Sequence, residues 1–320
     1  MTLSSSIKNL NYRFHCIHDD FITDPNVILN LEISPNSKES TSNSKKSTSN
    51  SKKSTSNSNE SIQNSNESIE NFRESLSNPR KSLSELGVQR GGSFNPSRCR
   101  AVHRTIILLP YRKREDQLRI FLENMHPFLV HQSINYTIVV VEQVDDLPFN
   151  RGKLFNVGFV EMTKINSQCC CFVFHDVDLL PEVSHNMYTC SKNPRHMSPF
   201  VNTLRYNLMY RQLFGGVIAM KRRQFKSVNG FSNLFYGWGG EDDDLSARIA
   251  KSGLSITRWP YSVSRYFMLH HKKEKPGGDK DLLLDTSDVR SSTDGLSTLE
   301  YKVISITEEP LFTRIQVALA

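Results

Sequence analysis

Hydrophobic and polar positions divide the chain into a polar N-terminal part and a regularly patterned remainder. From about residue 91 onward, short apolar runs alternate with amphipathic stretches. Continuous apolar runs predict buried strands, and apolar residues that recur every three or four positions predict helices. The predicted strands are 103–110, 136–142, 171–175, 215–220 and 255–258, and the predicted helices are 114–131, 150–165, 222–228 and 242–252.

The order of these elements is the βαβ pattern of an open α/β sheet. We therefore expect residues 99–320 to form one α/β domain with irregular ligand loops. Ligand sites in such sheets lie at the carboxyl ends of the strands. The predicted strand 171–175 runs directly into Asp176-Val177-Asp178, which places two carboxylates at that edge. Taken alone, such a pair is more often two solvated acids at a turn.

A seven-residue repeat of the type SKKSTSN occupies residues 37–85. The period suggests a coiled coil, but only the later copies carry Ile, Leu or Phe, and Ser and Asn are poor helix formers. We predict a disordered linker at 37–85, after an N-terminal segment at 1–36.

Composition narrows the function classes. The 320 residues are 37% apolar and 23% charged, with a formal net charge of +7, which suits an anionic substrate such as a nucleotide. Nucleic acid is not expected as a partner, because the lysine-rich repeats are interleaved with Ser and Asn instead of aromatic residues. No apolar run has the length of a signal peptide or a membrane span, so either the protein is cytosolic or a targeting segment lies outside this chain.

The six cysteines contain no CxxC pair, which argues against a structural zinc site. An even count suits one or two disulfides in an oxidising compartment. Three of the cysteines are consecutive, at 169–171, so at least one thiol is expected to stay free.

The segment 236–244, YGWGGEDDD, is the strongest chemical signal. The three glycines permit close approach of a ligand, and the Trp between them can serve as a stacking platform. Acids at the start of a helix are stabilised by the positive end of its dipole. Capping alone accounts for one or two acids and leaves the glycine-flanked Trp unexplained. Met268 and His271 gain meaning only beside these motifs, since a lone His is more often structural.

Several segments together resemble the β-1,4-galactosyltransferase family, over about residues 91–320. They are FNRGKLFNVG at 149–158, CFVFHDVDLLP at 171–181, FGGV at 214–217, GWGGEDDD at 237–244, and Asp294-Gly-Leu with Tyr301. Cys99, within GGSFNPSRC, resembles the family's entry to the catalytic domain.

The resemblance implies an α/β fold of the GT-A type, a Rossmann-type mixed sheet flanked by helices with long ligand loops. The implied enzyme is an inverting, manganese-dependent glycosyltransferase that moves galactose from UDP-galactose to a glycan acceptor such as terminal GlcNAc on glycoproteins or glycolipids.

The implied nucleotide-sugar contacts are Pro110, Tyr111, Arg112, Arg114, Phe149, Arg151, Asp176, Val177 and Trp238. The implied acceptor contacts are Gly239, Gly240, Glu241, Asp242 and Asp243, with Asp242 as the catalytic base. The implied Mn²⁺ ligands are Asp178, Met268 and His271, although Met is a soft ligand for this hard ion. The implied disulfides are Cys16 with Cys99 and Cys171 with Cys190.

Two departures from the family bear on specificity. Leu213 stands where members with strict galactose preference have Tyr, and the smaller side chain leaves room for the N-acetyl group of UDP-GalNAc. Leu283 and Leu284 stand about where the family has an Arg and an aromatic residue that hold the acceptor's N-acetyl group. Both the donor, galactose or GalNAc, and the acceptor therefore stay open.

Family members are type II Golgi membrane proteins, so the resemblance implies the Golgi lumen, although this chain shows no anchor. One alternative is a relative with another acceptor, such as glucose or xylose; Gly240 argues against the xylose-directed enzyme, which typically has Arg there. The other is a non-catalytic carbohydrate-binding or chaperone-like relative, which the presence of Asp242 and the metal ligands disfavours.

Overall fold

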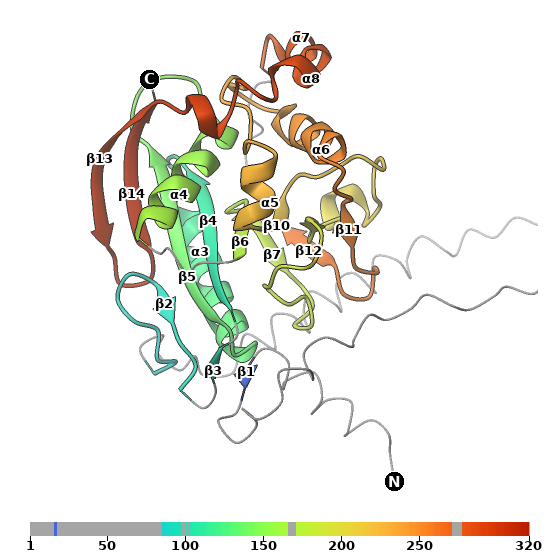
Figure 1. Cartoon of the computed structure of the whole chain (residues 1–320). Coiled ribbons are helices and arrows are strands. Elements are labelled where there is room, and N and C mark those ends of the chain that lie inside the picture. The colour runs from blue at the N-terminus through green and yellow to red at the C-terminus, as the bar shows by residue number, and fades with distance from the viewer. Residues whose placement is uncertain are drawn as a thin grey trace, which may run out of the picture. The chain divides into compact units, whose positions relative to one another are not determined.

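The computed structural model describes residues 16–17, 85–97, 100–101, 103–165, 171–270 and 277–319 (Figure 1). Residues 37–84 of the expected linker at 37–85, and most of the N-terminal segment, lie outside these residues. Helices in the described part are α3 (Glu115–His131), α4 (Arg151–Ile165), α5 (Arg222–Ser227), α6 (Glu241–Lys251), α7 (Lys280–Asp285) and α8 (Ser287–Arg290), with short 3₁₀ turns η2 (Asn202–Leu204) and η3 (Leu296–Thr298). None of the helices among these residues is long and apolar enough to cross a bilayer.

A mixed sheet of nine strands forms the centre of the described residues, in the order β11-β8-β10-β6-β4-β5-β14-β13, with β2 paired to β5. Pairings β4 with β5, β4 with β6, β5 with β14 and β8 with β11 are parallel, and the others are antiparallel. The strands are β2 (Ser93–Phe94), β4 (Arg104–Tyr111), β5 (Asn135–Gln143), β6 (Cys171–His175), β8 (Arg195–His196), β10 (Val217–Lys221), β11 (Thr257–Arg258), β13 (Tyr301–Glu308) and β14 (Thr313–Leu319).

Two smaller sheets complete the architecture. β7 (Leu179–Pro181), β12 (Arg265–Met268) and β9 (Phe200–Val201) form a three-stranded sheet, and β1 (Cys16–Ile17) pairs with β3 (Arg100–Ala101). The predicted α/β class, with a mixed sheet flanked by helices, is confirmed.

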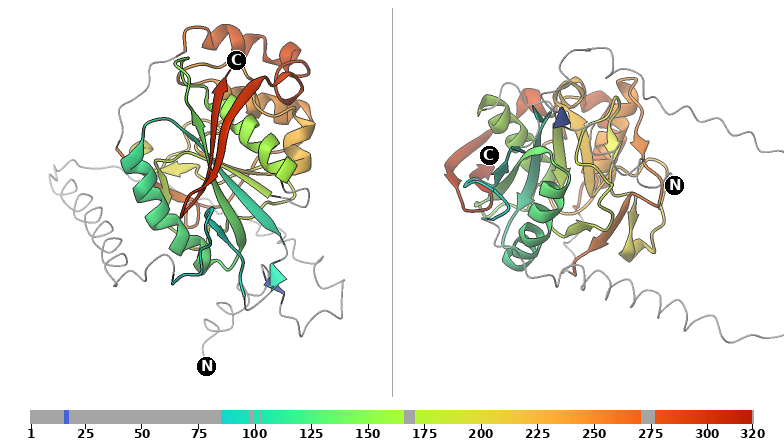
Figure 2. Two further views of the ribbon diagram at one scale, coloured as in Figure 1. Left: turned by 90° about the vertical axis from the view of Figure 1, so that its left-hand side faces the viewer. Right: turned by 90° about the horizontal axis from the view of Figure 1, so that it is seen from below.

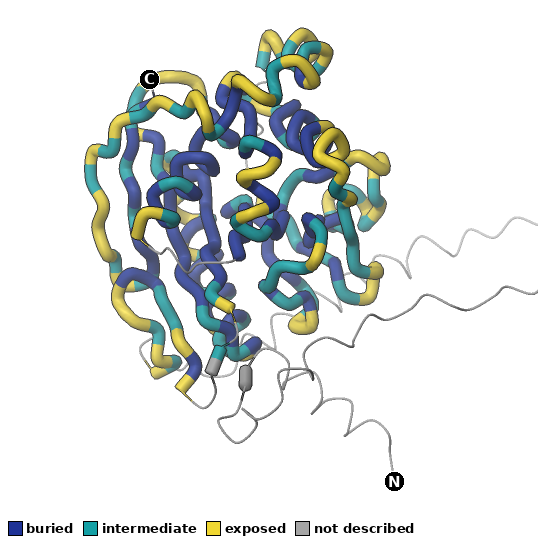
Figure 3. Tube along the Cα trace, viewed as in Figure 1, coloured by how far each residue is buried: buried dark blue, intermediate teal, exposed yellow. Residues whose placement is uncertain are grey.

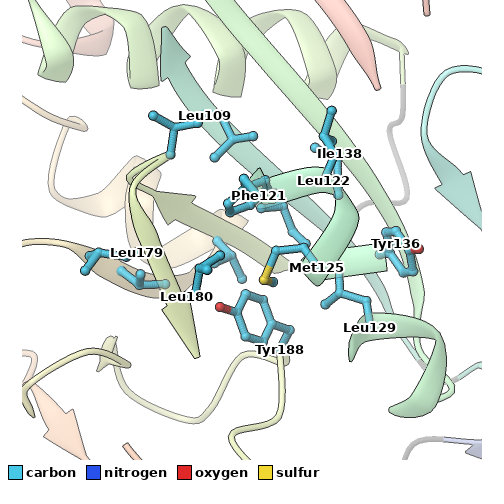
Figure 4. Packing of buried hydrophobic residues seen from close by; sticks show 14 of the residues in the cluster. Leu109, Phe121, Leu122, Met125, Leu129, Tyr136, Ile138, Leu179, Leu180 and Tyr188 are labelled. Atoms are coloured by element: carbon cyan, nitrogen blue, oxygen red, sulfur yellow. The ribbon is translucent and has the colours of Figure 1, made fainter. Parts of the chain in front are cut away.

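The strands alternate their side chains between two cores, one on each face of the sheet. Ile107 and Leu109 of β4 pack on the side of α3, with Phe121 and Met125 (Figure 4), whereas Leu108 packs on the side of α4. Figure 2 shows α3 and α4 on opposite sides of the central strands, and Figure 3 shows those strands as the most buried part of the chain. β4 and β5 are buried on both faces, which explains their near-continuous apolar sequences.

Most predicted elements are confirmed to within two residues, and two differences stand out. The strand predicted at 255–258 is reduced to Thr257–Arg258, because only these residues pair with β8. The hairpin β13–β14 is an addition to the predicted elements, and β14 enters the sheet between β5 and β13. Its outer strand leaves Ile304 and Ile306 exposed, so the alternation that marks a half-buried strand is weak there.

The segment before β2 is held beneath the β13–β14 turn by its glycines. The Gly91 amide donates to the carbonyl of Glu309 (2.7 Å), and the Gly92 carbonyl accepts from the Ile138 amide (3.1 Å). Gly92 has φ +68°, and a Cβ there would collide with the backbone of Leu311. Only glycine fits this crossing without strain.

Gly92→Ala is therefore expected to lower the free energy of unfolding by about 2 kcal/mol or more, as measured by urea unfolding. Gly278→Ala is the matched control, because a Cβ at Gly278 meets no atom within 4 Å. Equal stability of the two variants would contradict the close crossing.

Candidate active site

The two carboxylates after β6 point to different partners. Asp176 accepts a hydrogen bond from Nε of Arg151 at 2.6 Å. Asp178 is only 8% exposed, and its Oδ2 lies 3.8 Å from Nη1 of Arg114. Between them, Val177 is buried in the core on the α3 side, so a nucleotide sugar could meet this residue only through its backbone. The turn thus presents two acids and buries one apolar side chain.

A buried polar chain beneath this turn was not predicted from the sequence. Nδ1 of His175 lies 2.8 Å from the carbonyl oxygen of Asp176, and Nε2 lies 2.8 Å from the hydroxyl of Tyr188. The carbonyl can only accept, so Nδ1 carries the proton and Nε2 accepts from Tyr188. Burial lowers the pKa of His175 to about 3, which keeps the ring neutral. The position of His175 directly before the acids was the available signal.

Arg151, the first residue of α4, connects three segments of the site. Besides Asp176, it donates through Nη1 to Oε1 of Glu241 (3.2 Å) and through Nη2 to the carbonyl of Gly216 (3.2 Å). Its guanidinium also stacks over the ring of Phe155, 4.7 Å from the centroid. Burial alone would lower the pKa of Arg151, but the charges of Asp176 and Glu241 outweigh it and raise the pKa. Arg151 is therefore a permanent cation between two acids.

Helix α6 begins at Glu241, and its first acids are in unequal environments. Gly240 precedes it with φ +96°, a conformation that favours glycine. Burial raises the pKa of Glu241 to about 7, the charge of Asp242 adds to this, and Arg151 opposes it. Within the described chain, Oε2 of Glu241 is buried without a hydrogen-bond partner, which adds to the cost of burying the charged carboxylate.

Asp242 is half-buried, and burial raises its pKa as well. Its carboxylate lies directly against Gly215, where any Cβ would collide with it. Asp243 instead accepts a hydrogen bond from the hydroxyl of Tyr210 at 2.7 Å. Tyr210 is 43% exposed and was not predicted, because a single Tyr in a polar loop carries no pattern.

The fourth acid of the run is part of a buried ion-pair network instead of the site. Asp244 accepts from Nε of Arg248 at 2.5 Å, and Arg290 of α8 lies 3.6 Å away. Asp294, of the Asp294-Gly-Leu motif, joins the network by pairing with Arg248 at 3.3 Å. It also accepts from the backbone amide of Asn233 at 2.8 Å. This motif therefore ties α6 and α8 together.

Trp238 is 62% exposed, as a stacking platform requires, and Nζ of Lys280 lies 5.5 Å from the centroid of its ring. Gly239 has φ +96°, and a Cβ there would stand 3.4 Å from the Lys280 ammonium. The loop therefore holds a Trp in solvent beside a cation.

The candidate nucleotide segment follows β4. Pro110 and Tyr111 are buried, and Tyr111 belongs to the core on the α3 side, so only their backbone could contact a ligand. Arg112 donates to the carbonyl of Leu147 (2.7 Å), and its guanidinium lies 5.4 Å from the centroid of the Phe149 ring. Arg112 and Phe149 thus form one polar and aromatic surface.

Part of the expected metal set meets at one corner. The pairing of β12 with β7 places Met268 opposite Leu179, and the amide of Leu269 donates to the carbonyl of Asp178 at 2.7 Å. The backbones that carry Asp178 and Met268 are therefore adjacent.

His271, the third expected metal ligand, lies outside the described residues. No cluster of three His, Cys, Asp or Glu side chains suited to a metal occurs among the residues that the structure describes. Of the three expected ligands, only Asp178 is both described and one of these four residue types. A buried carboxylate at this corner fits a divalent cation.

Leu213 lies half-buried in the loop before β10, where its amide donates to the carbonyl of Tyr210 at 3.2 Å.

The disulfide Cys171–Cys190 is confirmed, with Cα atoms 5.4 Å apart. Cys16 belongs to β1, opposite Ala101, but its side chain and Cys99 lie outside the described part, so that disulfide stays a prediction.

Comparisons with known proteins agree on one family. Residues 51–191 match the model for the N-terminal region of glycosyl transferase group 7, and residues 195–272 match the model for the N-terminal domain of galactosyltransferase. β-1,4-Galactosyltransferase 4 of Cricetulus griseus is 43% identical over 230 residues, which are 71% of this chain and 67% of the relative. Human β-1,4-galactosyltransferase 1 is 42% identical over 234 residues, 72% of this chain and 58% of the relative.

Solved structures give the same result. The catalytic domain of Drosophila β-1,4-galactosyltransferase 7, in complex with xylobiose, matches with a TM-score of 0.59 and 30% identity, covering 68% of this chain and 95% of that one. A mutant of that enzyme, in complex with manganese, UDP-Gal and xylobiose, matches with the same TM-score of 0.59 and 31% identity. The expected GT-A type of fold is confirmed.

The raised pKa of Glu241 predicts a pH effect on stability. A carboxyl whose pKa rises to about 7 on folding binds more protons in the folded state, so stability falls as pH rises from its unfolded pKa of 4.5 through about 7. Glu241→Gln removes this titration. From about pH 5 to about pH 8, without divalent metal, we expect wild type to lose about 1 to 3 kcal/mol of unfolding free energy relative to the variant.

The measurement is urea unfolding of both proteins across this range in EDTA. Glu115→Gln, at an exposed position in the first turn of α3, controls for the loss of a carboxylate. Parallel curves for wild type and Glu241→Gln would show that Glu241 titrates normally.

Proposed function

This chain belongs to the β-1,4-galactosyltransferase family, a family of hexosyltransferases, and from that premise we propose that it transfers galactose from UDP-galactose in β-1,4 linkage to a glycan acceptor. The acceptor that we propose is a terminal GlcNAc-type sugar, with GalNAc as an additional donor sugar. The observation that carries the proposal is the pairing of Arg151 with both Asp176 and Glu241, which brings the acids after β6 and the start of α6 into one site.

Asp242 is the proposed catalytic base. In an inverting displacement, the acceptor hydroxyl oxygen bonds to the anomeric carbon while the bond from that carbon to the UDP oxygen breaks, and the hydroxyl proton passes to a carboxylate. Asp242 is half-buried, and its raised pKa makes it a better proton acceptor than a solvated Asp. Asp243 and Tyr210, bonded to each other beside it, are the residues that we propose to bind other acceptor hydroxyls.

Asp178, Met268 and His271 are the residues that we propose to hold Mn²⁺. When bound, the ion supplies positive charge to the leaving diphosphate. Arg112 and Arg114 are the proposed phosphate partners from this chain, and Phe149 offers an aromatic face beside Arg112. Trp238, exposed on its glycine loop, supplies an apolar face to the sugars.

The proposed location is the Golgi lumen, as a type II membrane protein. The disulfide Cys171–Cys190 supports a secretory location, because such bonds persist in oxidising compartments.

Asp242→Asn tests the proposed activity. The variant keeps the shape of the side chain but cannot accept the proton, so we expect kcat to fall by about 10³-fold with the melting temperature retained. The assay offers UDP-Gal and UDP-GalNAc with β-GlcNAc, glucose and xylose acceptors, in manganese or EDTA. Transfer that needs manganese and is lost in Asp242→Asn supports the proposal. If folded, disulfide-bonded wild type transfers to none of these acceptors, the result contradicts the proposed activity and favours the alternative of a carbohydrate-binding relative.

Leu213→Tyr tests the donor proposal in the same assay. The larger side chain should exclude the N-acetyl group, so we expect the ratio of kcat/KM for UDP-Gal over UDP-GalNAc to rise about tenfold or more. Leu213→Met is the control of conserved volume and should leave the ratio near that of wild type. An unchanged ratio in Leu213→Tyr would place the donor's N-acetyl group elsewhere.

A further inference from the structure

Two side chains from the edge of the main sheet hold the loop 211–216, and neither belongs to the site described above. Arg258 donates through Nη2 to the carbonyl oxygens of Arg211 (2.9 Å) and Leu213 (2.6 Å). His196 contacts the next alternate carbonyl, that of Gly215, through Nε2 at 3.0 Å. Three alternate carbonyls on one side of the loop are thus bonded to two side chains.

The two side chains are also bonded to each other in a single consistent arrangement. Nε of Arg258 lies 3.1 Å from Nδ1 of His196. A guanidinium only donates, so Nδ1 must accept, and the ring proton is on Nε2, where it reaches Gly215. Burial and the neighbouring charge of Arg258 lower the pKa of His196 to about 3, so the ring stays neutral and Nδ1 stays free to accept.

The sheet fixes the positions of both residues. β11 pairs in parallel with β8, and in that register Arg258 is the direct partner of His196. β8 in turn pairs with β10, where His196 stands opposite Ile218. Because β10 begins just after the loop, the same strands define both the end of the loop and the groups that hold it.

The loop presents its other contacts to the candidate site. Gly215 leaves space for the Asp242 carboxylate, and the carbonyl of Gly216 accepts from Arg151 at 3.2 Å. Leu213, the candidate donor-specificity residue, lies between the two carbonyls that Arg258 and His196 hold at 211 and 215. A shift of this backbone would therefore move Leu213 and the surroundings of Asp242 together.

We infer that Arg258 and His196 are positioning residues that set donor-sugar selectivity by fixing the backbone of the loop 211–216. Neither side chain is proposed to touch the substrate. The selectivity part of this inference rests on the proposed transferase function, whereas the positioning part does not.

Arg258→Lys is the test, because lysine keeps the charge but has all its N–H donors on one nitrogen, which cannot take the places of both Nε at His196 and Nη2 at the two carbonyls. The first measurement is hydrogen exchange, followed by mass spectrometry, of the peptide that covers 211–217. We expect exchange of its protected amides to accelerate about tenfold, the effect of losing one charge-assisted hydrogen bond. His196→Gln, which retains one donor and one acceptor, should give a smaller acceleration.

Arg314→Lys is the matched control, since Arg314 is a half-buried arginine that bonds Glu142 on the far side of the sheet. Its exchange at 211–217 should equal that of wild type. Equal exchange in Arg258→Lys and Arg314→Lys would overturn the inference, whatever the activity of the protein.

The second measurement is the ratio of kcat/KM for UDP-Gal over UDP-GalNAc. In Arg258→Lys we expect this ratio to change about tenfold, with KM for the donor raised and the affinity for UDP unchanged, because UDP lacks the sugar. A purely structural role would lower kcat/KM for both donors and the affinity for UDP by the same factor. That result would overturn the selectivity role. An inactive wild type would refute the proposed function, while the exchange data still decide the positioning role.

Discussion

One guanidinium, that of Arg151, makes the candidate site possible. Asp176, Glu241 and Asp242 come from two distant segments, and like charges on these carboxylates would repel at close range, which adds to the effect of burial in raising the pKa of Glu241. Arg151 lies between the two segments, bonds one acid from each and bonds the backbone before β10 with its remaining donors. Removing one partner of a buried ion pair is strongly destabilising, because the remaining charge is left uncompensated. The position of Arg151 at the start of α4 therefore fixes how β6, β10 and α6 meet.

Helical geometry explains why four consecutive acids do not share one role. Successive residues of α6 turn by about 100° around its axis, so neighbouring side chains face different surroundings. Glu241 faces Arg151, Asp243 reaches the exposed Tyr210, and Asp244 faces the buried Arg248. Asp242 is half-buried, as Asp243 is, and lies against Gly215. The four acids therefore divide into two groups. Glu241 and Asp244 are buried and form ion pairs, whereas Asp242 and Asp243 are half-buried.

The fold could be predicted from the sequence where a buried element carried a long apolar run or a helical period, whereas the buried strands β7, β8 and β14 were not predicted. The apolar runs of β4, β5 and β6 and the periodicity of α3 and α4 are direct consequences of the two cores. β13 was missed because an edge strand with exposed Ile304 has no clear alternation.

Candidate site residues that belong to a motif could be proposed from the sequence, but residues that depend on tertiary hydrogen bonds could not. His175, Tyr210, His196 and Arg258 depend on partners in other segments of the chain, and no local pattern records those partners. Conversely, sequence similarity placed Tyr111 and Val177 among the ligand contacts, whereas the structure buries both side chains in the core.

The place of β14 in the sheet constrains the order in which the protein is built. β5 pairs with β4 on one edge and with β14 on the other, and β14 is the last of the described strands along the chain. During synthesis, residues 139–143 of β5, beyond the part that β2 covers, therefore have no partner on this edge until β14 emerges from the ribosome. An open apolar edge invites pairing with other chains. Until β14 pairs with it, this edge of β5 is open to pairing with another chain.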